Sequence, residues 1–318
     1  MNADRKPIIV TGGFGFIGAS MVRRLVNQGE KVIVFAKKTS TPQRLNDLRD
    51  SIIWYEEDLS DRVRLAERIA SANPKGIFHF AASNIQSGAT AADGDVIQTN
   101  ILGTVNLVEA AKGVPYDFFI YTGTFLEYGS KDHAFKEDDL PEPSNVYAVS
   151  KLAASLYCQA IAKKDKQPIV VLRLMTPYGP DMQKGRLMYE LVERSLQGMP
   201  LILTHPKVAR DFIYVTDVLD LCLEAASKAQ KIKGEIYNVG SGVQTTLGEL
   251  VDLVRTETSS QSEVQWGTFR QVAYDTDTLY ADMTKTFSAF SWRPKVTPEE
   301  GIRHMANWFR KPDDSVDK

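Results

Sequence analysis

Residues 11–18, with the sequence TGGFGFIG, follow a short apolar run at Ile8–Val10 and open an amphipathic stretch. Gly12, Gly15 and Gly18 have the spacing of a tight turn between a strand and a helix. In such a turn the first glycine permits the bend, the second lets the backbone approach a pyrophosphate, and the third lets the helix pack close on the strand. The helix N-terminus then offers N–H groups and a partial positive charge to that pyrophosphate. The stretch therefore predicts a dinucleotide-binding loop.

Short apolar runs alternate with amphipathic stretches from the N-terminus to about Leu174. The runs are rich in Val, Ile, Phe and Tyr, which is typical of strands buried on both faces of a sheet. The predicted strands are Ile8–Thr11, Lys31–Ala36, Ile52–Tyr55, Gly76–Phe80, Phe118–Thr122 and Ile169–Leu174. The helices predicted between them include Phe16–Gln28, Asp61–Ala72 and Asp95–Lys112. This alternation implies right-handed βαβ units, so we expect an α/β fold with a Rossmann-like, doubly wound parallel sheet.

After Thr176 the predicted elements become shorter and less regular. A helix is expected at Arg186–Gln197, a strand at Glu235–Asn238 and a helix at Leu247–Thr256. We interpret residues 1–176 as an NADP-binding Rossmann domain to which 208–242 return. Residues 177–207 and 243–318 then form a smaller C-terminal substrate-binding lobe over the carboxyl edge of the sheet, where open α/β sheets bind their ligands.

The composition limits the class of partner. The 318 residues include 38 Lys and Arg against 40 Asp and Glu, a formal charge of −2, so no bulk charge favours nucleic acid or an anionic membrane. The first seven residues lead straight into a predicted strand, and no run of about 18 apolar residues follows. Cys158 and Cys222 lack the spacing of a zinc pair, and no two histidines have metal-ligand spacing. We therefore expect a cytoplasmic protein with no metal and no nucleic-acid or membrane partner.

The end of the second predicted strand bears on the choice of dinucleotide. An NAD enzyme places a carboxylate there, about 20 residues after the loop, to bond the ribose 2′-hydroxyl. This chain has Ala36 followed by Lys37 and Lys38. A lysine can pair with a 2′-phosphate that a carboxylate would repel. We therefore expect NADP(H) to be preferred, with NAD(H) as the alternative if these lysines are only surface charge.

A second motif predicts acid–base chemistry. Tyr147 and Lys151 lie four residues apart at the start of a predicted helix, so their side chains share one face. A nearby cation lowers the pKa of a tyrosine from about 10 toward neutral pH, which makes the phenol a usable general acid or base. Thr124 follows the fifth predicted strand, where a substrate carbonyl would lie. The plain alternative for Tyr147 and Lys151 is a surface pair on a helix.

Together these motifs and several further stretches resemble one family, the extended short-chain dehydrogenase/reductases. This family includes nucleotide-sugar epimerases, dehydratases and reductases, and the resemblance covers almost the whole chain. The matching stretches are the glycine loop, FHFAA at 78–82, NILGT at 100–104, YAVSK at 147–151, RLMTPYGP at 173–180, RDFIYVTDV at 210–218 and YNVGSG at 237–242.

The resemblance implies a role for each matching residue. Tyr147 is the acid/base, Lys151 binds the cofactor ribose and adjusts the tyrosine pKa, and Thr124 bonds the reacting oxygen. Arg210 falls at the diphosphate of a nucleotide sugar, although a structural partnership with Asp211 or Asp217 is the alternative. The implied cofactor-binding residues are Gly12, Phe14, Gly15, Phe16, Ile17, Lys37, Lys38, Asp58, Leu59, Ala81, Ala82, Asn100, Thr122, Tyr147 and Lys151. The implied substrate-binding residues are Ser83, Thr124, Thr176 and Arg210.

Departures from the family pattern also affect the expected chemistry. The 4,6-dehydratases carry an acidic pair two and three residues before a Tyr-Gly, where this chain has Phe125 and Leu126. Apolar residues cannot supply the acid and base that eliminate water. Glu127 is offset by one position and is expected to point elsewhere. Thr176 replaces the usual Asn, and residues 270–275 scarcely match the RPGD segment of the family.

The leading hypothesis is an NADPH-dependent reductase of a nucleotide-linked keto-deoxysugar, acting at the C4 ketone. A nucleotide-sugar 4-epimerase with the same residues is the main alternative. A reductase of apolar ketones and a dinucleotide sensor without turnover are less favoured, because Arg210 suits a diphosphate and both Tyr147 and Lys151 are retained. The family resemblance also implies a homodimer.

Overall fold

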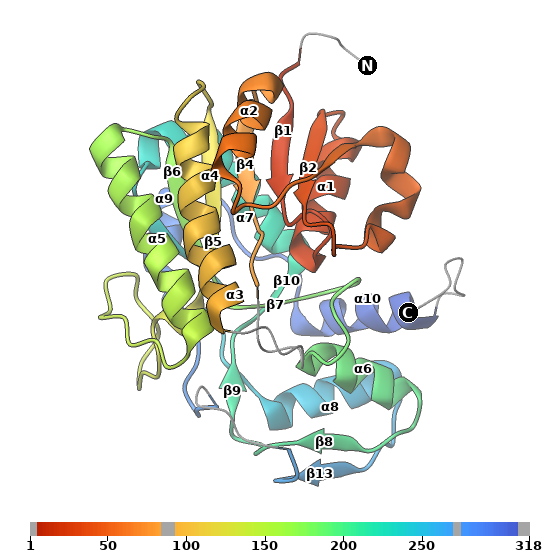
Figure 1. The fold of residues 1–318 in the computed structure, drawn as a ribbon. Helices are drawn as coiled ribbons and strands as arrows, with labels where there is room; N and C mark the ends of the chain where they lie inside the picture. The colour runs from red at the N-terminus through yellow and green to blue at the C-terminus, as the bar shows by residue number, and fades with distance from the viewer. Residues whose placement is uncertain (1–4, 84–92, 270–274, 311–318) are drawn as a thin grey trace.

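The computed structural model describes residues 5–83, 93–269 and 275–310, and a seven-stranded sheet lies at its centre (Figure 1). All neighbouring strands run parallel, in the order β11-β6-β5-β4-β1-β2-β3. The strands are β1 (Ile8–Thr11), β2 (Val32–Ala36), β3 (Ile53–Glu56), β4 (Gly76–His79), β5 (Phe118–Thr124), β6 (Ile169–Leu174) and β11 (Ile236–Val239). The strand order runs outward from β1 on both sides, which confirms the doubly wound, Rossmann-like α/β prediction.

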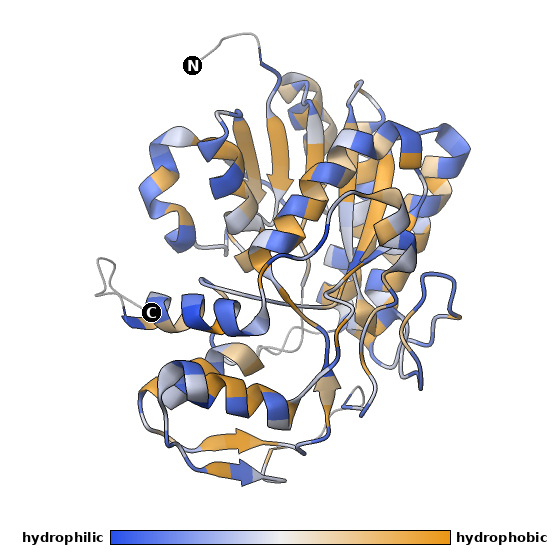
Figure 2. Cartoon of the chain, turned by 180° about the vertical axis from the view of Figure 1, so that it is seen from behind, coloured by the Kyte–Doolittle hydropathy of each residue, from blue (hydrophilic) through white to orange (hydrophobic). Residues whose placement is uncertain are grey.

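Helices cover both faces of this sheet. The helices on one face are α1 (Phe16–Asn27) and α7 (Val215–Ile232), and those on the other are α2 (Arg62–Ala72), α4 (Gly103–Ala111) and α5 (Val146–Asp165). Side chains of β1 alternate between the two cores: Ile8 and Val10 face the first, and Ile9 faces the second. Figure 2 shows the apolar strands as the orange centre between these layers.

The predicted ends of elements lie within about three residues of the observed ones, which is the usual precision of sequence patterns. The stretch predicted as one helix over Asp95–Lys112 consists of α3 (Asp93–Ile97), a π-helical turn η3 (Gln98–Leu102) and α4. The expectation that both faces are buried is wrong for the third predicted strand, Ile52–Tyr55. Ile53 and Trp54 are 54% and 47% exposed, because β3 is an edge strand of the sheet.

A smaller lobe lies beneath the carboxyl edge of the sheet in the view of Figure 1. Its elements are α6 (Leu187–Leu196), α8 (Leu247–Thr258), α10 (Pro298–Arg310) and the paired strands β8 (Leu201–Leu203) and β13 (Val264–Trp266). Leu191, Leu250 and Ile302 are central members of its own apolar core. Two short strand pairs connect it to the sheet domain, β7 (Thr176–Tyr178) with β10 (Phe212–Tyr214) and β9 (Ala209–Arg210) with β12 (Thr245–Thr246). A short helix α9 (Thr284–Ala289) packs near β11.

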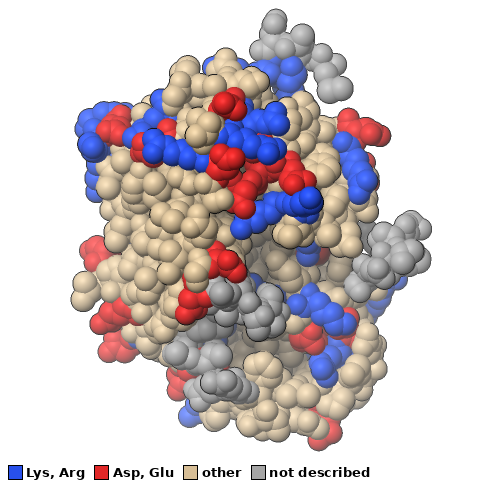
Figure 3. Space-filling view, viewed as in Figure 1, with Lys and Arg blue, Asp and Glu red and all other residues tan. Residues whose placement is uncertain are grey.

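The surface carries charges of both signs in alternation over the upper part of the sheet domain, and a hollow lies between the two lobes (Figure 3). This mixing agrees with the formal charge of −2. Within the described ranges, no helix combines the length and the apolar character that a membrane span requires.

Candidate active site

The glycine loop adopts a turn that only glycine permits. Gly12 has a φ of +67°, and a Cβ on it would lie 2.6 Å from the backbone nitrogen of Ala81, in the loop after the neighbouring strand β4. Gly15 caps α1 without a side chain, and its N–H donates to the carbonyl of Gly12 at 2.9 Å. The N-terminus of α1 therefore has no side-chain cap, and its first residues Gly15, Phe16 and Ile17 line the cavity. This arrangement fits a dinucleotide pyrophosphate.

The three predicted catalytic residues line one cavity of about 910 Å³ together with this loop. Thr124 is the last residue of β5, and Tyr147 and Lys151 lie in the first turns of α5. Asn145 fixes where α5 begins, because its side chain accepts a hydrogen bond from the N–H of Ala148 at 2.9 Å. The structure therefore brings together groups separated by 27 residues of chain, at the carboxyl edge of the sheet.

Burial dominates the ionisation of the tyrosine and the lysine. It raises the pKa of Tyr147 to about 12, opposed by the charge of Arg186. Burial also lowers the pKa of Lys151 to about 8, while the Lys151 ammonium lies 4.3 Å from the ring centre of Tyr121. The expectation that Lys151 lowers the tyrosine pKa toward neutrality is therefore wrong for this arrangement, because desolvation outweighs the effect of nearby cations.

Asn100 acts behind the cavity wall. Its side-chain amide donates to the hydroxyl of Ser150 at 2.9 Å and to the carbonyl of Ser83 at 3.0 Å, and its oxygen accepts from the N–H of Ser83 at 2.8 Å. Ser150 in turn donates to the carbonyl of Tyr147 at 2.8 Å. Asn100 thus joins the loop after β4 to the start of α5. It lies in the π-helical turn, which is a common feature near functional sites.

Glu127 points away from the cavity, as expected. One carboxylate oxygen accepts from the N–H of Thr124 and the hydroxyl of Ser155, both at 2.9 Å. The other pairs with Nε of Arg173 at 2.7 Å, and both side chains are almost fully buried. The carboxylate therefore anchors Thr124 through the backbone but does not reach a substrate. By contrast, Phe125 and Leu126 both line the cavity.

The two lysines that follow β2 differ in their relation to the cavity. Lys37 lines the cavity and donates to the hydroxyl of Thr99 at 2.9 Å, whereas Lys38 is exposed and does not line it. Glu57, which directly follows β3, also lines the cavity. Its fully buried carboxylate pairs with Arg64 and Arg68 at 2.9 and 2.7 Å, so two cations balance its charge.

The remaining predicted residues divide between the cavity wall and the structure behind it. Those that line the cavity are Gly12, Gly15, Phe16, Ile17, Leu59, Ala81, Ala82, Thr122, Thr176 and Arg210. Those that do not are Phe14, Lys38, Asp58, Ser83 and Asn100. Phe14 packs edge-on against Trp54 with the ring centres 5.6 Å apart, and the carboxylate of Asp58 accepts from the N–H of Ser60 at 2.9 Å. For Phe14 and Asp58, the structure therefore supports a local structural role.

The smaller lobe supplies cationic side chains to the same cavity. Arg210 forms an ion pair with Asp275, so its structural partner is neither Asp211 nor Asp217. Two further arginines, Arg186 and Arg194, also line it and were missed in the sequence. Arg186 is the N-cap residue of α6, and Glu190 and Arg194 follow at intervals of four residues on one face of the helix. This spacing is the signal that could have found them.

His79 is a core residue, as its place in a predicted strand suggests. Its ring nitrogens lie 2.6 Å from the hydroxyl of Thr11 and 2.9 Å from that of Thr104. Burial, with a smaller contribution from the charge of Lys151, lowers its pKa to about 3. In the described parts of the chain no group of three His, Cys, Asp or Glu side chains could hold a metal ion.

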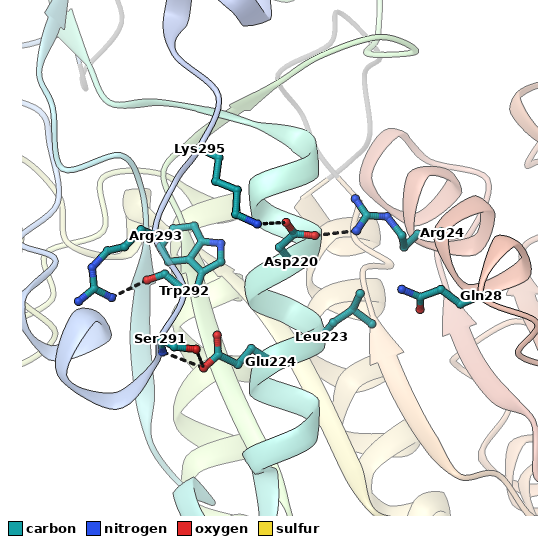
Figure 4. Close-up of a pocket in the computed structure, with 9 residues that line it drawn as sticks. All are labelled: Arg24, Gln28, Asp220, Leu223, Glu224, Ser291, Trp292, Arg293 and Lys295. Carbon is teal, nitrogen blue, oxygen red and sulfur yellow. Dashed lines mark hydrogen bonds and ion pairs between the residues drawn. The ribbon is translucent and has the colours of Figure 1, made fainter.

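A second cavity, of about 480 Å³, lies away from these groups between α1, α7 and residues 291–295 (Figure 4). Its charged side chains mostly satisfy one another. Asp220 pairs with Arg24 at 2.6 Å and Lys295 at 3.5 Å, and Glu224 accepts from Ser291. These pairs connect the elements that line the cavity, which suggests a structural role for them.

The fold and the cavity define a dinucleotide-binding enzyme of the short-chain dehydrogenase/reductase type. The chain belongs to the NAD dependent epimerase/dehydratase family, whose model matches residues 8–240. This match confirms the resemblance inferred from the motifs.

Individual relatives within this family have different activities. The chain is 29% identical to a dTDP-D-glucose 4,6-dehydratase of Mus musculus, over 96% of this chain and 89% of that protein. It is 27% identical to the crystal structure of a UDP-glucose 4-epimerase of Thermotoga maritima with UDP-glucose, with a TM-score of 0.86 over 96% of this chain and 98% of the other. It is 26% identical to a dTDP-glucose 4,6-dehydratase of Bacillus anthracis in complex with NAD, with a TM-score of 0.84 over 95% and 96% of the two chains.

Proposed function

We propose that this protein is a nucleotide-sugar 4-epimerase. The observation that carries the proposal is that Thr124, Tyr147 and Lys151 line one cavity together with the glycine loop and the arginines Arg186, Arg194 and Arg210. The similarity to a UDP-glucose 4-epimerase over nearly the full length of both chains supports it. The comparisons favour this alternative over the reductase that we expected from the sequence.

The residues of the cavity have separate tasks in this reaction. A bound nicotinamide supplies reversible hydride transfer at C4 of the sugar. Tyr147 accepts the proton of the C4 hydroxyl as the carbonyl forms, and it returns the proton after the keto sugar has turned its other face, which inverts C4. Its pKa of about 12 makes the returning step the easier of the two. Thr124 donates a hydrogen bond to that oxygen. Lys151 holds the ribose of the cofactor, and Arg210 pairs with the diphosphate.

Water elimination, the activity of several named relatives, is not part of this proposal. A dehydratase needs an acid and a base beyond the tyrosine, and Phe125 and Leu126 are apolar. The neighbouring carboxylate of Glu127 is committed to Arg173, Thr124 and Ser155. The likeness to dehydratases therefore extends to the overall sequence and the fold, but these side chains do not support the extra chemistry.

The NADPH-dependent reductase of a keto-deoxysugar is the second candidate. Lys37 lines the adenosine end of the cavity, Ala36 replaces the usual acid, and Glu57 is occupied by two arginines. This combination would tolerate a 2′-phosphate. A reductase consumes an exchanging cofactor, whereas an epimerase regenerates a cofactor that it retains, so the two candidates differ in how they hold the dinucleotide.

We further propose that the protein forms a homodimer through α4 and α5. These helices pack against each other on one face of the sheet domain. Apolar side chains are exposed along this side, with Leu102, Val149 and Leu156 between 45% and 48% exposed. Their exposure would be relieved by the same two helices of a second copy. Sedimentation at several concentrations tests this proposal, which fails if the chain stays monomeric at the concentration of the activity assay.

The cofactor of freshly purified protein tests the main proposal. Release by denaturation, followed by chromatography, identifies the dinucleotide, and incubation with labelled NAD measures its exchange. The epimerase predicts tightly held NAD(H) that exchanges slowly. Weakly held NADP(H) that exchanges at once would instead favour the reductase.

A further inference from the structure

The wall of the cavity beside the reacting oxygen is apolar. Phe125 and Leu126 follow Thr124 directly in the short 3-10 helix η4 (Phe125–Glu127), and both line the cavity. Met175, which follows β6, lines it too. The three side chains are 9%, 5% and 2% exposed, so their positions are fixed by packing on several sides. A substituent that touches this wall therefore meets carbon and sulfur atoms.

The position of η4 is itself constrained by buried polar contacts. The side chain of Thr124 caps η4, and Glu127 at its end bonds back to the N–H of Thr124. The ion pair of Glu127 with Arg173 holds this turn from behind. The backbone of Phe125 and Leu126 consequently cannot move away from the cavity without breaking a buried ion pair and a capping box.

The charged side chains of the cavity lie elsewhere, in a lining that also contains apolar residues of the smaller lobe. They are Arg186 and, in two ion pairs, Arg194 with Glu190 and Arg210 with Asp275. The three arginines exceed the two acids by one positive charge, so this part of the cavity suits an anionic group. The wall directly beside Thr124 has no charged member among Phe125, Leu126 and Met175, so a substituent next to the reacting carbon meets apolar groups there.

We propose that Phe125 and Leu126 make the enzyme selective for nucleotide-linked 6-deoxysugars, which carry a methyl group where other hexoses carry a hydroxymethyl group. The proposal rests on the C4 chemistry given above, because C6 is attached to the ring carbon next to C4. A methyl group packs against the apolar wall, whereas a C6 hydroxyl loses its water and gains no partner there. Discrimination against one extra hydroxyl in an apolar pocket reaches about a hundredfold.

Two substrate pairs that differ in one hydroxyl test this selectivity. The pairs are UDP-glucose with UDP-6-deoxyglucose and dTDP-glucose with dTDP-6-deoxyglucose. For each, kcat/KM for 4-epimerisation and Kd by calorimetry are measured on the purified protein with its cofactor. We expect the 6-deoxy member of the accepted pair to be favoured about 10- to 100-fold in kcat/KM and in the same direction in Kd.

Two variants assign this preference to the wall. Leu126→Asn places an amide beside the C6 position and should bring the preference close to one. Phe125→Tyr keeps the ring, adds one hydroxyl and should reduce the preference in a protein that folds as the parent does. The matched control is Ile202→Asn, since Ile202 also lines the cavity but lies on β8 and is 39% exposed. It should leave the preference unchanged.

The possible failures are distinguishable. Equal kcat/KM and Kd for the two members of a pair overturn the selectivity and leave the epimerase intact. Binding with the 6-deoxy preference but no epimer overturns the epimerase and supports the selectivity. A preference that survives both Leu126→Asn and Phe125→Tyr overturns the assignment to these residues. If the protein binds neither pair of nucleotide sugars, the proposal of a nucleotide-sugar site is itself overturned.

Discussion

The buried ion pair behind the active site leads to a quantitative prediction for Glu127→Gln. Glutamine keeps an oxygen that can accept from Thr124 and Ser155, but it removes the negative charge 2.7 Å from Nε of Arg173. The two side chains of the pair are 0% and 2% exposed, so water cannot replace the lost partner. Removing one member of such a pair leaves an uncompensated buried charge and typically costs 3–5 kcal/mol, about 3 kcal/mol when the replacement still accepts hydrogen bonds.

Urea unfolding followed by circular dichroism measures this loss against a matched control. Glu142→Gln makes the same chemical change in an ion pair with Lys131, but the Glu142 side chain is 58% exposed. That variant should lose at most about 1 kcal/mol. The double variant Glu127→Gln/Arg173→Met removes both charges, keeps the oxygen that accepts from Thr124 and Ser155, and should be more stable than Glu127→Gln. The reasoning is refuted if Glu127→Gln and Glu142→Gln have the same free energy of unfolding, or if the double variant is the least stable of the set.

Three further predictions concern the site and its surroundings. Tyr147→Phe should lower kcat by about 10²- to 10⁴-fold with an unchanged Kd for the cofactor. The control Tyr157→Phe, on the same helix, should remain active. A fully active Tyr147→Phe enzyme would contradict the mechanism. Lys37→Gln should weaken NADPH binding about tenfold and leave NADH binding unchanged, whereas Lys38→Gln should change neither, and equal effects on both dinucleotides would contradict the placement of Lys37. Burial lowers the pKa of His79 in the folded state to about 3, below its usual 6.5, so its contribution to stability is complete above pH 6.5 and is lost as the pH falls toward 3. Between pH 7 and pH 5 the free energy of unfolding of the parent protein should therefore fall by about 2 kcal/mol more than that of His79→Gln. Parallel pH profiles for the two proteins would contradict this.

Local patterns were sufficient to predict most of the sheet domain. The glycine loop depends on residues within one turn of the chain, and Gly12 adopts the positive φ that this loop requires. Tyr147 and Lys151 lie on one helix, so their spacing alone places them on the same face. The carboxyl ends of parallel strands meet at one edge, which is why Thr124 was also expected near them.

What the sequence did not predict depends on contacts between distant segments. The partner of Glu127 is Arg173, 46 residues away on the neighbouring strand. The pairing of Arg210 with Asp275 joins β9 to a segment 65 residues later. The pKa of Tyr147 likewise depends on how deeply the hydroxyl is buried, and burial reversed the direction expected from the nearby lysine. None of these features leaves a periodic or spaced signal in the chain.

The cofactor preference was also inferred from too few residues. Ala36, Lys37 and Lys38 are adjacent in sequence, but only Ala36 and Lys37 line the cavity. The ion pairs of Glu57 with two arginines of α2 could not be predicted from the sequence of the preceding strand. A lysine near the end of a strand is therefore a candidate contact for an anionic group of the cofactor. Whether the lysine makes that contact depends on whether its side chain points into the cavity.

The most direct test of the proposed epimerase follows the hydrogen at C4. UDP-6-deoxyglucose and UDP-glucose, each deuterated at C4, and the corresponding dTDP sugars are incubated with the protein in ordinary water and the products are identified by NMR. The account predicts the C4 epimer with deuterium retained at C4, no net change in reduced cofactor, and no product when Tyr147 is replaced by Phe. Loss of water from the sugar, net transfer of deuterium to exchanging cofactor, or no epimer from any of these substrates would contradict it.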